Sequence, residues 1–479
     1  MQRHRSTRYL AVLVSLAVAA AATPRVSTAQ GFGVNEVGTC AASRGFAVTG
    51  SPCQDASAIF WNPAATGQLK GWSILAGAAI IKVGGTFTRD TTFTEYEGAA
   101  PTAVVPHVFL NYTPANSKLS YGAGLYVPYG LTSQWDDSFP GRFQALKASL
   151  HTFYVQPNIS YQLSKNWSIG AGPVIGHSSV ELIQALDLSA QVANPGPPTI
   201  TFGQLGIPKR TEFARARLQG DAMAYGAHVG VFGRLNDHWT LGARWLTPLE
   251  FEYNDADATF TQTNTGIVLP PGNPICAGNP AACGGSASAP ANIDAIVAGQ
   301  FTGGALTTQT VNTKITHPAQ VQAGVGYSGF KDWLVSADYT FTGWRRFKEL
   351  PLAFSNALLG TRTLIEDYNN TSSVRLGAQR SFTSGAALRV GFAGVASAAP
   401  DETVTPLLPE QDRSYASIGG SYPFMGRYAI EAAYLKVFAP GKRGRIDERT
   451  TRTQTAAQLN TGVYELNANV FSVSIKANY

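Results

Sequence analysis

The stretch Phe471–Tyr479 (FSVSIKANY) alternates between apolar and polar side chains without interruption. Successive side chains of an extended strand point to opposite faces, so this alternation divides the segment into two surfaces. Phe471, Val473, Ile475, Ala477 and Tyr479 share the apolar surface. Ser472, Ser474, Lys476 and Asn478 share the polar surface. The pattern predicts a β-strand with an apolar medium on one side and a polar one on the other.

The same alternation recurs around residues 153–161 and 332–341. A soluble β-sandwich alternates too, with its apolar face inward. Two features favour a membrane barrel instead. The expected strands have roughly 12–16 residues, against ~5–6 in soluble proteins, and aromatic residues gather at one end of the strands, as in the girdle of a membrane barrel. Trp167, Trp239, Trp333 and Tyr428 each closely follow a short turn, and Tyr479 ends the last strand.

Short turns and long polar loops alternate along the chain, as in outer-membrane barrels with short periplasmic turns and longer extracellular loops. The strands that we expect cover approximately 71–88, 102–113, 118–131, 148–163, 166–181, 215–235, 238–253, 310–328, 332–347, 369–382, 386–399, 412–424, 427–442 and 464–479. Their number is even, as in single-chain bacterial barrels, so both termini are expected in the periplasm. We therefore predict an all-β fold, a 14-stranded antiparallel transmembrane β-barrel over residues 71–479.

Composition and charge exclude other classes of protein. Charged residues make up only 14% of the chain and hydrophobic residues 44%, which is too apolar for a disordered protein. The basic segment Met1–Arg8, the apolar stretch Tyr9–Thr23 and the small residues Ser27–Ala29 predict a signal peptide over residues 1–29, in preference to a membrane anchor. This peptide holds four of the 36 basic residues and no acid, so its removal lowers the net charge from +6 to +2. Nucleic-acid binding is therefore not indicated.

Residues 30–70 precede the first strand and lack its alternation. A barrel of more than about eight strands has a lumen that its own side chains cannot fill. The large apolar residues of this segment need an apolar environment, so we expect a compact plug in the lumen, in preference to a periplasmic tail. These residues are Phe32, Phe46, Ile59, Phe60 and Trp61.

The four cysteines of this exported chain favour disulfides. They form two pairs that are close in sequence, Cys40 with Cys53 and Cys276 with Cys283, and we favour this pairing among the three possible ones. Neither pair has histidine or cysteine neighbours at the spacing of a zinc site. We expect no metal and no cofactor.

The segment before the first strand resembles the hatch of FadL-type transporters, the outer-membrane channels for long-chain fatty acids and, in some members, aromatic hydrocarbons. The resemblance rests on Gly31–Glu36 (GFGVNE), Arg44–Ala47 (RGFA), Asp55–Ala58 (DASA) and Asn62–Ala64 (NPA). It continues at Val105–His107, Tyr129–Leu131, Asn166–Gly170, Tyr339–Trp344, Leu408–Arg413, Gly419 and Tyr422, and so covers nearly all of the mature chain. It implies a fourteen-stranded barrel with an N-terminal hatch over residues 30–70.

The resemblance also implies a lateral gate at a kink in the third strand, through which an apolar ligand leaves sideways into the membrane. The matching segment is Val127, Pro128, Tyr129 and Gly130. Pro128 cannot donate to a ladder, and Gly130 weakens the strand locally. If the turn at residues 114–117 sets the register, Pro106 on the second strand lies opposite roughly Leu125. The alternative is that these prolines mark ordinary bulges, as Pro157 and Pro173 do in other strands.

Ligand capture is expected at the long outer loops and in the lumen. Apolar residues in regions expected to be polar suggest a docking groove, with loop packing as the alternative. They are Phe139, Phe143 and Leu146 after the third strand, and Leu182, Ile183 and Leu186 after the fifth. A carboxylate head group would need a nearby base, for which Arg345, Arg346 and Lys348 are candidates. Residues 181–187 offer no base where fatty-acid members carry one, which leaves neutral hydrocarbons open as substrates.

Several polar residues match the hatch or the start of a late strand. Phe32, Asn35, Glu36, Arg44, Asp55, Asn62, Pro63 and Ala64 are the expected hatch residues. Asn62 is expected to anchor the hatch by hydrogen bonds, whereas Arg44 and Asp55 are equally compatible with a purely structural role. Glu410, Asp412 and Arg413 are expected to form an ion-pair cluster in the lumen.

These observations predict an outer-membrane channel of a Gram-negative bacterium that takes up hydrophobic small molecules. Long-chain fatty acids or related compounds are the expected ligands, with aromatic hydrocarbons as the alternative, and outer-membrane lipid and lipopolysaccharide surround a monomer. A general diffusion porin is less compatible with a bulky, stapled N-terminal segment. An enzyme is not expected, because none of the seven histidines falls in a recognisable catalytic arrangement.

Overall fold

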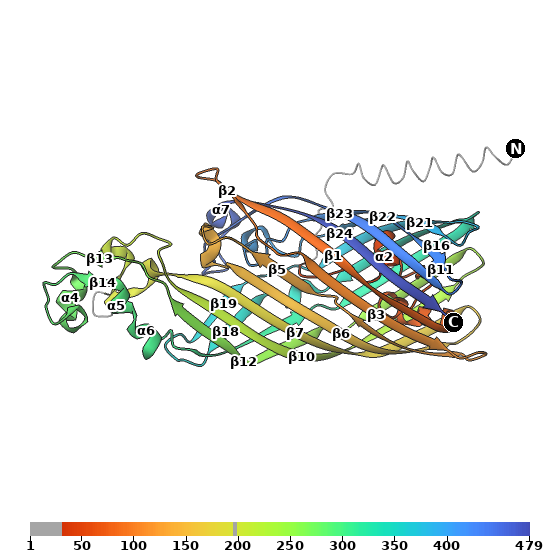
Figure 1. Cartoon of the computed structure of the whole chain (residues 1–479), viewed down its shortest axis with the longest axis horizontal. Helices are drawn as coiled ribbons and strands as arrows, with labels where there is room; N and C mark the ends of the chain where they lie inside the picture. The colour runs from red at the N-terminus through yellow and green to blue at the C-terminus, as the bar shows by residue number, and fades with distance from the viewer. Residues whose placement is uncertain (1–30, 195–198) are drawn as a thin grey trace.

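The strands of the chain form one closed cylindrical sheet. The computed structural model describes residues 31–194 and 199–479, so the predicted signal peptide lies outside the described residues. Strand β1 (Gly71–Arg89) pairs antiparallel with both β3 (Ala103–Thr113) and β24 (Gly462–Asn478), and these pairings close the cylinder. The cylinder lies along the long axis of Figure 1, with the C-terminus at one end.

Within the described residues the chain runs along the barrel wall in fourteen antiparallel passes, each made of one strand or of two strands in succession. This number confirms the predicted one. Besides β1, β3 and β24, the single-strand passes are β6 (Lys147–Gln162), β7 (Trp167–Asp187), β10 (Glu212–Arg234), β21 (Ala387–Val395), β22 (Arg413–Phe424) and β23 (Tyr428–Gly444). Five passes are interrupted: β4 (Leu119–Tyr126) with β5 (Gly130–Gln134), β11 (Trp239–Leu246) with β12 (Leu249–Gln262), β15 (Gln309–His317) with β16 (Gln320–Phe330), β17 (Trp333–Thr342) with β18 (Glu349–Phe354), and β19 (Thr361–Ile365) with β20 (Thr371–Ser381).

Apolar side chains point outward and polar side chains inward, as in a lipid-facing barrel. On β6, Phe153 and Ile159 are exposed on the outer face, whereas Gln156 and Asn158 between them are buried. This arrangement is the reverse of a soluble sandwich and confirms the membrane barrel. Exposed aromatic residues gather at the end that carries the short turns, and they include Trp167, Trp239, Trp333 and Tyr479.

The helices of the chain are short. In the described part of the chain, no helix is both long and apolar enough to cross a membrane. Helices α2 (Thr39–Ser43) and α3 (Ala58–Trp61) and the 3₁₀ helix η1 (Pro63–Gln68) lie inside the cylinder, and a disulfide joins Cys40 to Cys53 beside them (Figure 1). We call residues 31–70 the hatch.

The hatch packs its aromatic residues against charged residues of the barrel wall. Phe60 and Trp61 are fully buried, and the Arg244 guanidinium lies 4.8 Å from the centre of the Phe60 ring. Arg375 lies 5.8 Å from the ring of Phe46. Such cation–π contacts are strong when both groups are desolvated, so the polar lumen accommodates an apolar hatch without a continuous apolar wall.

Hydrogen bonds join the hatch to the wall at Asn62 and Arg44. The Asn62 amide donates to the carbonyl oxygens of Thr49 and Val231, at 3.0 Å each. Arg44 donates to the hydroxyl of Ser336 on β17 at 2.8 Å. Close approach of the two backbones also requires glycine, because a Cβ atom on Gly50 would lie 2.1 Å from the carbonyl of the wall residue Gly324.

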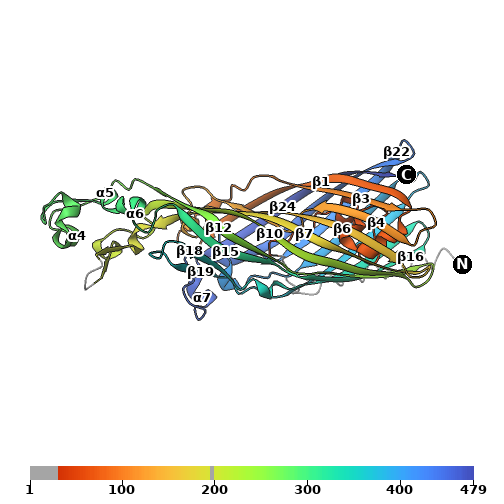
Figure 2. The same ribbon diagram turned by 90° about the horizontal axis from the view of Figure 1, so that it is seen from below.

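A small extracellular unit projects beyond the barrel (Figures 1 and 2). Its helices α4 (Pro274–Gly278), α5 (Ile293–Val297) and α6 (Gly299–Thr302) and its strands β13 (Val268–Leu269) and β14 (Ala291–Asn292) lie between β12 and β15, and a disulfide joins Cys276 of α4 to Cys283 within the unit. Its core includes Ile275 and Ile293, which cluster with Phe202 of the preceding loop. Asp294 accepts hydrogen bonds from the backbone and hydroxyl of Thr265 and from the backbone of Gly266.

Replacement of Asn62 tests the anchoring of the hatch. In Asn62→Ala, the buried carbonyl of Thr49 and the partly buried carbonyl of Val231 lose the Asn62 donor, and a buried group left without a partner costs about 1–3 kcal/mol. We expect a properly inserted barrel whose hatch exchanges its amide hydrogens faster, measured by hydrogen exchange with mass spectrometry. Asn166→Ala, at an exposed turn, is the control. Equal exchange in both variants would contradict the anchoring role.

The extracellular unit should be sensitive to acid through Asp294. Burial raises the pKa of this carboxyl, but the hydrogen bonds from Thr265 and Gly266 outweigh burial and hold the pKa below its ordinary value of 3.8. Its stabilising effect is therefore present above pH 3.8 and lost as the pH falls through the pKa of the folded state. We expect Asp294→Asn to raise the protease sensitivity of this unit at about pH 7, and to differ less from wild type at a pH below 3.8. Asp257→Asn, on the exposed face of β12, should behave as wild type at both pH values.

Candidate functional site

The third pass of the barrel is interrupted between β4 and β5, where Val127, Pro128 and Tyr129 leave the sheet. The expected pairing of Pro106 with Leu125 is wrong, because Leu125 pairs with Val108. The turn between β3 and β4 extends two residues beyond the expected 114–117. The Ser117 hydroxyl donates to the carbonyl of Leu119 and accepts from its backbone N–H, and these two bonds hold Lys118 in the turn.

A window in the barrel wall follows from this interruption. In the described part of the chain, β3 pairs with the third pass only up to Val108, and β5 pairs with β6 but not with β3. Residues 103–107 of β3 therefore face the window without a partner strand on that side. The window ends on the extracellular side at a bridge between Gly98 and Trp135.

The N-terminal end of the hatch lies against the inner side of the window. The backbone of Val34 donates to the carbonyl of Pro128, and Gly130 donates to the carbonyl of Phe32, at 2.9 Å each. Gly33 and Tyr129 form a single antiparallel bridge. The hatch thus supplies the kinked pass with the backbone partners that β3 does not provide.

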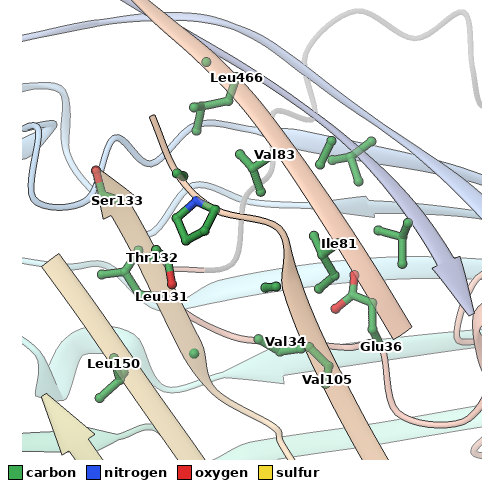
Figure 3. A pocket seen from close by; sticks show the side chains of 18 of the residues that line it. Val34, Glu36, Ile81, Val83, Val105, Leu131, Thr132, Ser133, Leu150 and Leu466 are labelled. Atoms are coloured by element: carbon green, nitrogen blue, oxygen red, sulfur yellow. The ribbon is translucent and has the colours of Figure 1, made fainter. Parts of the chain in front are cut away.

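A cavity of about 460 Å³ occupies the window. Figure 3 shows some of its lining side chains; the lining as a whole comes from the hatch, from strands β1, β3, β5, β6, β22, β23 and β24 and from the loops beside them. The side chains include Val34 and Glu36 from the hatch, Ile81 and Val83 from β1, Val105 from β3, Leu131 from β5, Leu150 from β6 and Leu466 from β24. The volume lies in the usual range of small-molecule sites, about 300–1,000 Å³, and the lining is predominantly apolar.

A second, smaller cavity of about 90 Å³ lies deeper in the lumen. Leu131, Leu150 and Leu408 line both cavities and so form a common wall. Phe32 lines the inner cavity, whereas its neighbours Gly31, Gly33 and Val34 line the window cavity. Residues 31–34 therefore separate the two spaces.

Aromatic side chains hold Phe32 in this position. Its ring contacts the rings of Trp344 at 4.7 Å and of His317 and Phe347 at 5.5 Å between centroids. Sequence reasoning missed these three partners. Trp344 and Phe347 lie three residues apart with two arginines between them, and this spacing, which puts both rings on one face of a 3₁₀ turn, was the available signal.

The predicted basic residues lie on a different surface from the cavities. Arg345, Arg346 and Lys348 are exposed, and none of them lines either cavity in the described part of the structure. The 3₁₀ helix η6 (Trp344–Arg346) turns them away while Trp344 and Phe347 are buried. The structure does not bring these cations to the apolar lining.

The predicted apolar capture residues are divided between several places. The expectation that Leu182, Ile183 and Leu186 lie in a loop is wrong, because β7 continues to Asp187. Of this group, Leu182 lines the inner cavity. Phe139 is buried and stacks on Trp135 at 4.3 Å, Leu146 is buried near it, and Phe143 is half-buried beneath Arg142.

The predicted charge cluster has a different arrangement from the expected one. The Glu410 carboxylate accepts hydrogen bonds from the backbone of Gly31, Ala398 and Ala399, and Asp412 accepts from the backbone of Ser397. Glu410 thus fixes the start of the hatch. Arg413 lines the window cavity and is attracted by Glu410 and by Glu36 of the hatch.

The remaining hatch residues are buried against the wall. Asn35 accepts a hydrogen bond from Arg375, and the carbonyl of Pro63 accepts one from Asn158 of β6. The carbonyl of Ala64 accepts from Ser168 of β7. Asp55 accepts from Ser57 within the hatch, so its contacts are local.

Nearly the whole chain matches one family of outer-membrane proteins. The outer membrane protein transport protein family (OMPP1/FadL/TodX) matches residues 18–479. This chain belongs to that family. The 47 kDa outer membrane protein of Pasteurella multocida is 26% identical over 456 residues, which cover 95% of this chain and 97% of the relative. A long-chain fatty acid transport protein of Salmonella typhi is 25% identical over 421 residues, with 86% and 88% covered.

Solved structures with the same fold include members of the family. A FadL homologue of Pseudomonas aeruginosa superimposes with a TM-score of 0.76 at 21% identity and covers 94% of this chain and all of the other chain. The toluene transporter TodX of P. putida superimposes with a TM-score of 0.64 at 16% identity, with 94% and 99% covered. The family and the barrel place this protein in the outer membrane of a Gram-negative bacterium as a transport protein.

Removal of the Phe32 ring should join the two cavities. In Phe32→Ala, residues 31–34, which separate the two cavities, lose their largest side chain. Truncation of a buried phenylalanine costs about 3–5 kcal/mol of stability. We expect more frequent opening in planar-bilayer conductance recordings than for wild type. Ile159→Ala, on the outer face of β6 and away from both cavities, should leave the conductance unchanged. Identical traces for wild type and Phe32→Ala would show that residues 31–34 are not the barrier.

Proposed function

We propose that this protein takes up lipophilic small molecules, which pass from the extracellular side through the inner cavity and leave sideways through the window. Long-chain fatty acids or related compounds are the proposed ligands. The window cavity carries the proposal, because it combines an apolar lining with a break in the hydrogen-bonded wall.

The surroundings of the window support a lateral exit. Val104 of β3 is 63% exposed, and Ile80 of β1 and Phe153 of β6 are also exposed on the outer face. A ligand that leaves the cavity there meets apolar side chains and then lipid, so it does not need to enter water. In an intact antiparallel sheet, paired strands leave no space for such a passage.

The choice between ligand classes depends on the charges near the cavities. Arg413 and His151 are the basic residues in the described lining of the window cavity, and Glu36 and Glu410 partly neutralise Arg413. A carboxylate ligand would compete with these two acids for Arg413, whereas a neutral hydrocarbon needs no such exchange. Aromatic hydrocarbons are thus the alternative, and identification of lipids that co-purify with the barrel distinguishes the two classes.

We further propose that the protein acts as a channel and not as an enzyme, and that it is a monomer surrounded by outer-membrane lipid and lipopolysaccharide. The closed sheet supports a monomer, because in the described structure the edge of β3 at the window is short and the rest of the cylinder is paired. The filled lumen argues against a general diffusion porin, since the hatch fills the space that a porin leaves to water.

Filling the window tests the lateral route. A Cβ atom on Gly130 would have its nearest neighbour at 3.5 Å, so Gly130→Leu is tolerated by the backbone and directs a side chain into the window cavity. We expect a folded barrel with at least about tenfold slower uptake of radiolabelled oleate, because the side chain blocks the exit.

Gly343→Leu is the matched control, since its Cβ would meet no atom closer than 3.7 Å and Gly343 lines neither cavity. Uptake of toluene is measured in parallel. Slower uptake of both compounds by Gly130→Leu alone supports one shared lateral exit. Unchanged uptake of both compounds by Gly130→Leu would rule out the window as the route.

A further inference from the structure

A third cavity, of about 340 Å³, lies on the other side of the hatch. It opens at the end of the barrel that carries the short turns, and we call it the vestibule. Its roof is the lower side of the hatch, including the Cys40–Cys53 disulfide, Arg44 and Ser51. Its walls include Arg234 of β10, His238, Gln379 of β20, Arg389 of β21, Ser421 of β22 and Lys476 of β24.

The lining of the vestibule carries positive charge. Arg44, Arg234, Arg389 and Lys476 line it together with His238, and among the described residues no aspartate or glutamate does. Glutamine, serine and threonine side chains supply most of the remaining polar surface. A cavity with four permanent cations and no acid in its lining attracts anions from the solvent.

The counter-charge behind this lining is incomplete. Glu431, which is fully buried, is shared between Arg389 at 3.2 Å and Lys476 at 3.4 Å. Arg389 is 4% exposed, and its Nη1 has no hydrogen-bond partner in the described structure. Its other nitrogens donate to Gln379, Ser421 and Glu431. One carboxylate thus serves two buried or half-buried cations.

The hatch adds a further cation to the same space. Arg44 is held by the carbonyl oxygens of Ala47 and Ser51 and by the hydroxyl of Ser336, and its Nε has no partner among the described residues. Arg389 repels it electrostatically, and the opposing attraction by Asp338 is the smaller of the two effects. An anion between the two guanidinium groups would replace this repulsion by attraction on both sides.

We propose that the vestibule binds a small oxyanion, carried as a phosphate or carboxylate group, between Arg44 of the hatch and Arg389, Lys476 and Arg234 of the barrel. Guanidinium groups hold such oxyanions by paired charge-assisted hydrogen bonds. Because the anion contacts both parts, its binding fastens the hatch to the wall. This site is separate from the window and the lateral route.

Thermal unfolding of the purified mature chain in detergent tests the site. Inorganic phosphate is titrated against chloride at constant ionic strength, and sodium acetate serves as the carboxylate probe. We expect phosphate or acetate to raise the unfolding temperature with saturation, and isothermal titration calorimetry to give one site per chain. The probe that binds more tightly identifies the preferred oxyanion. No saturable effect of either probe beyond that of chloride would overturn the proposal.

Variants place the binding in the vestibule. Arg234→Gln removes an exposed cation. The double variant Arg389→Gln with Glu431→Gln removes one buried cation and one buried anion together, so that the half-buried Lys476 is the charge left in this cluster. Each should weaken binding about tenfold through loss of a charge-assisted contact. Lys331→Gln, on a neighbouring turn outside the vestibule, should bind as wild type. Equal affinity of Arg234→Gln and wild type would place the anion elsewhere, even if the double variant fails to fold.

Discussion

The fold depends on the need to satisfy every backbone hydrogen bond that faces hydrocarbon. An unpaired N–H or C=O costs several kcal/mol in lipid, so a sheet can span a membrane only if it closes on itself. The pairing of β1 with β24 meets this requirement along nearly the whole length of both strands. The window between β3 and β5 is the departure from it, and there the hatch segment 32–34 supplies backbone partners to the kinked pass from inside. Wall and hatch are therefore one hydrogen-bonded unit at this point.

The alternation of side chains follows from the same closure and made most of the barrel predictable. Where strands cross lipid, one face must be apolar, so Phe153 and Ile159 alternate with Gln156 and Asn158 and the period of two is unmistakable. Above the membrane this constraint ends. At Leu182–Leu186 of β7 the extracellular loops pack on the strand, apolar residues occupy both faces, and the segment no longer reads as a strand although it is one.

The candidate site was less predictable, because it depends on register and on contacts between distant segments. The resemblance to the family points to Val127–Gly130. The extent of the window, however, depends on the register between β3 and β4, and the turn that contains the Ser117 hydroxyl bond sets this register. The direction of Arg345 and Arg346 does not follow from the sequence pattern, because they lie in a 3₁₀ turn, where the period of two does not apply. The prediction that they contact the ligand was therefore wrong about which way they point. Their buried neighbour Trp344 contacts Phe32, more than three hundred residues away in sequence.

The distribution of contacts along the hatch separates it into two parts. Residues 39–66 bond to many strands, through Thr39 to β24, Arg44 to β17 and Asn62 to β10, and a disulfide joins Cys40 to Cys53 within this segment. Residues 31–36 instead depend on the edge of the window, on the carboxylate of Glu410, on a hydrogen bond from Arg375 to Asn35 and on the aromatic rings around Phe32. A displacement that clears the window needs to break only this second set. The first set can stay in place and keep the lumen filled, so a lateral passage does not require an open pore through the membrane.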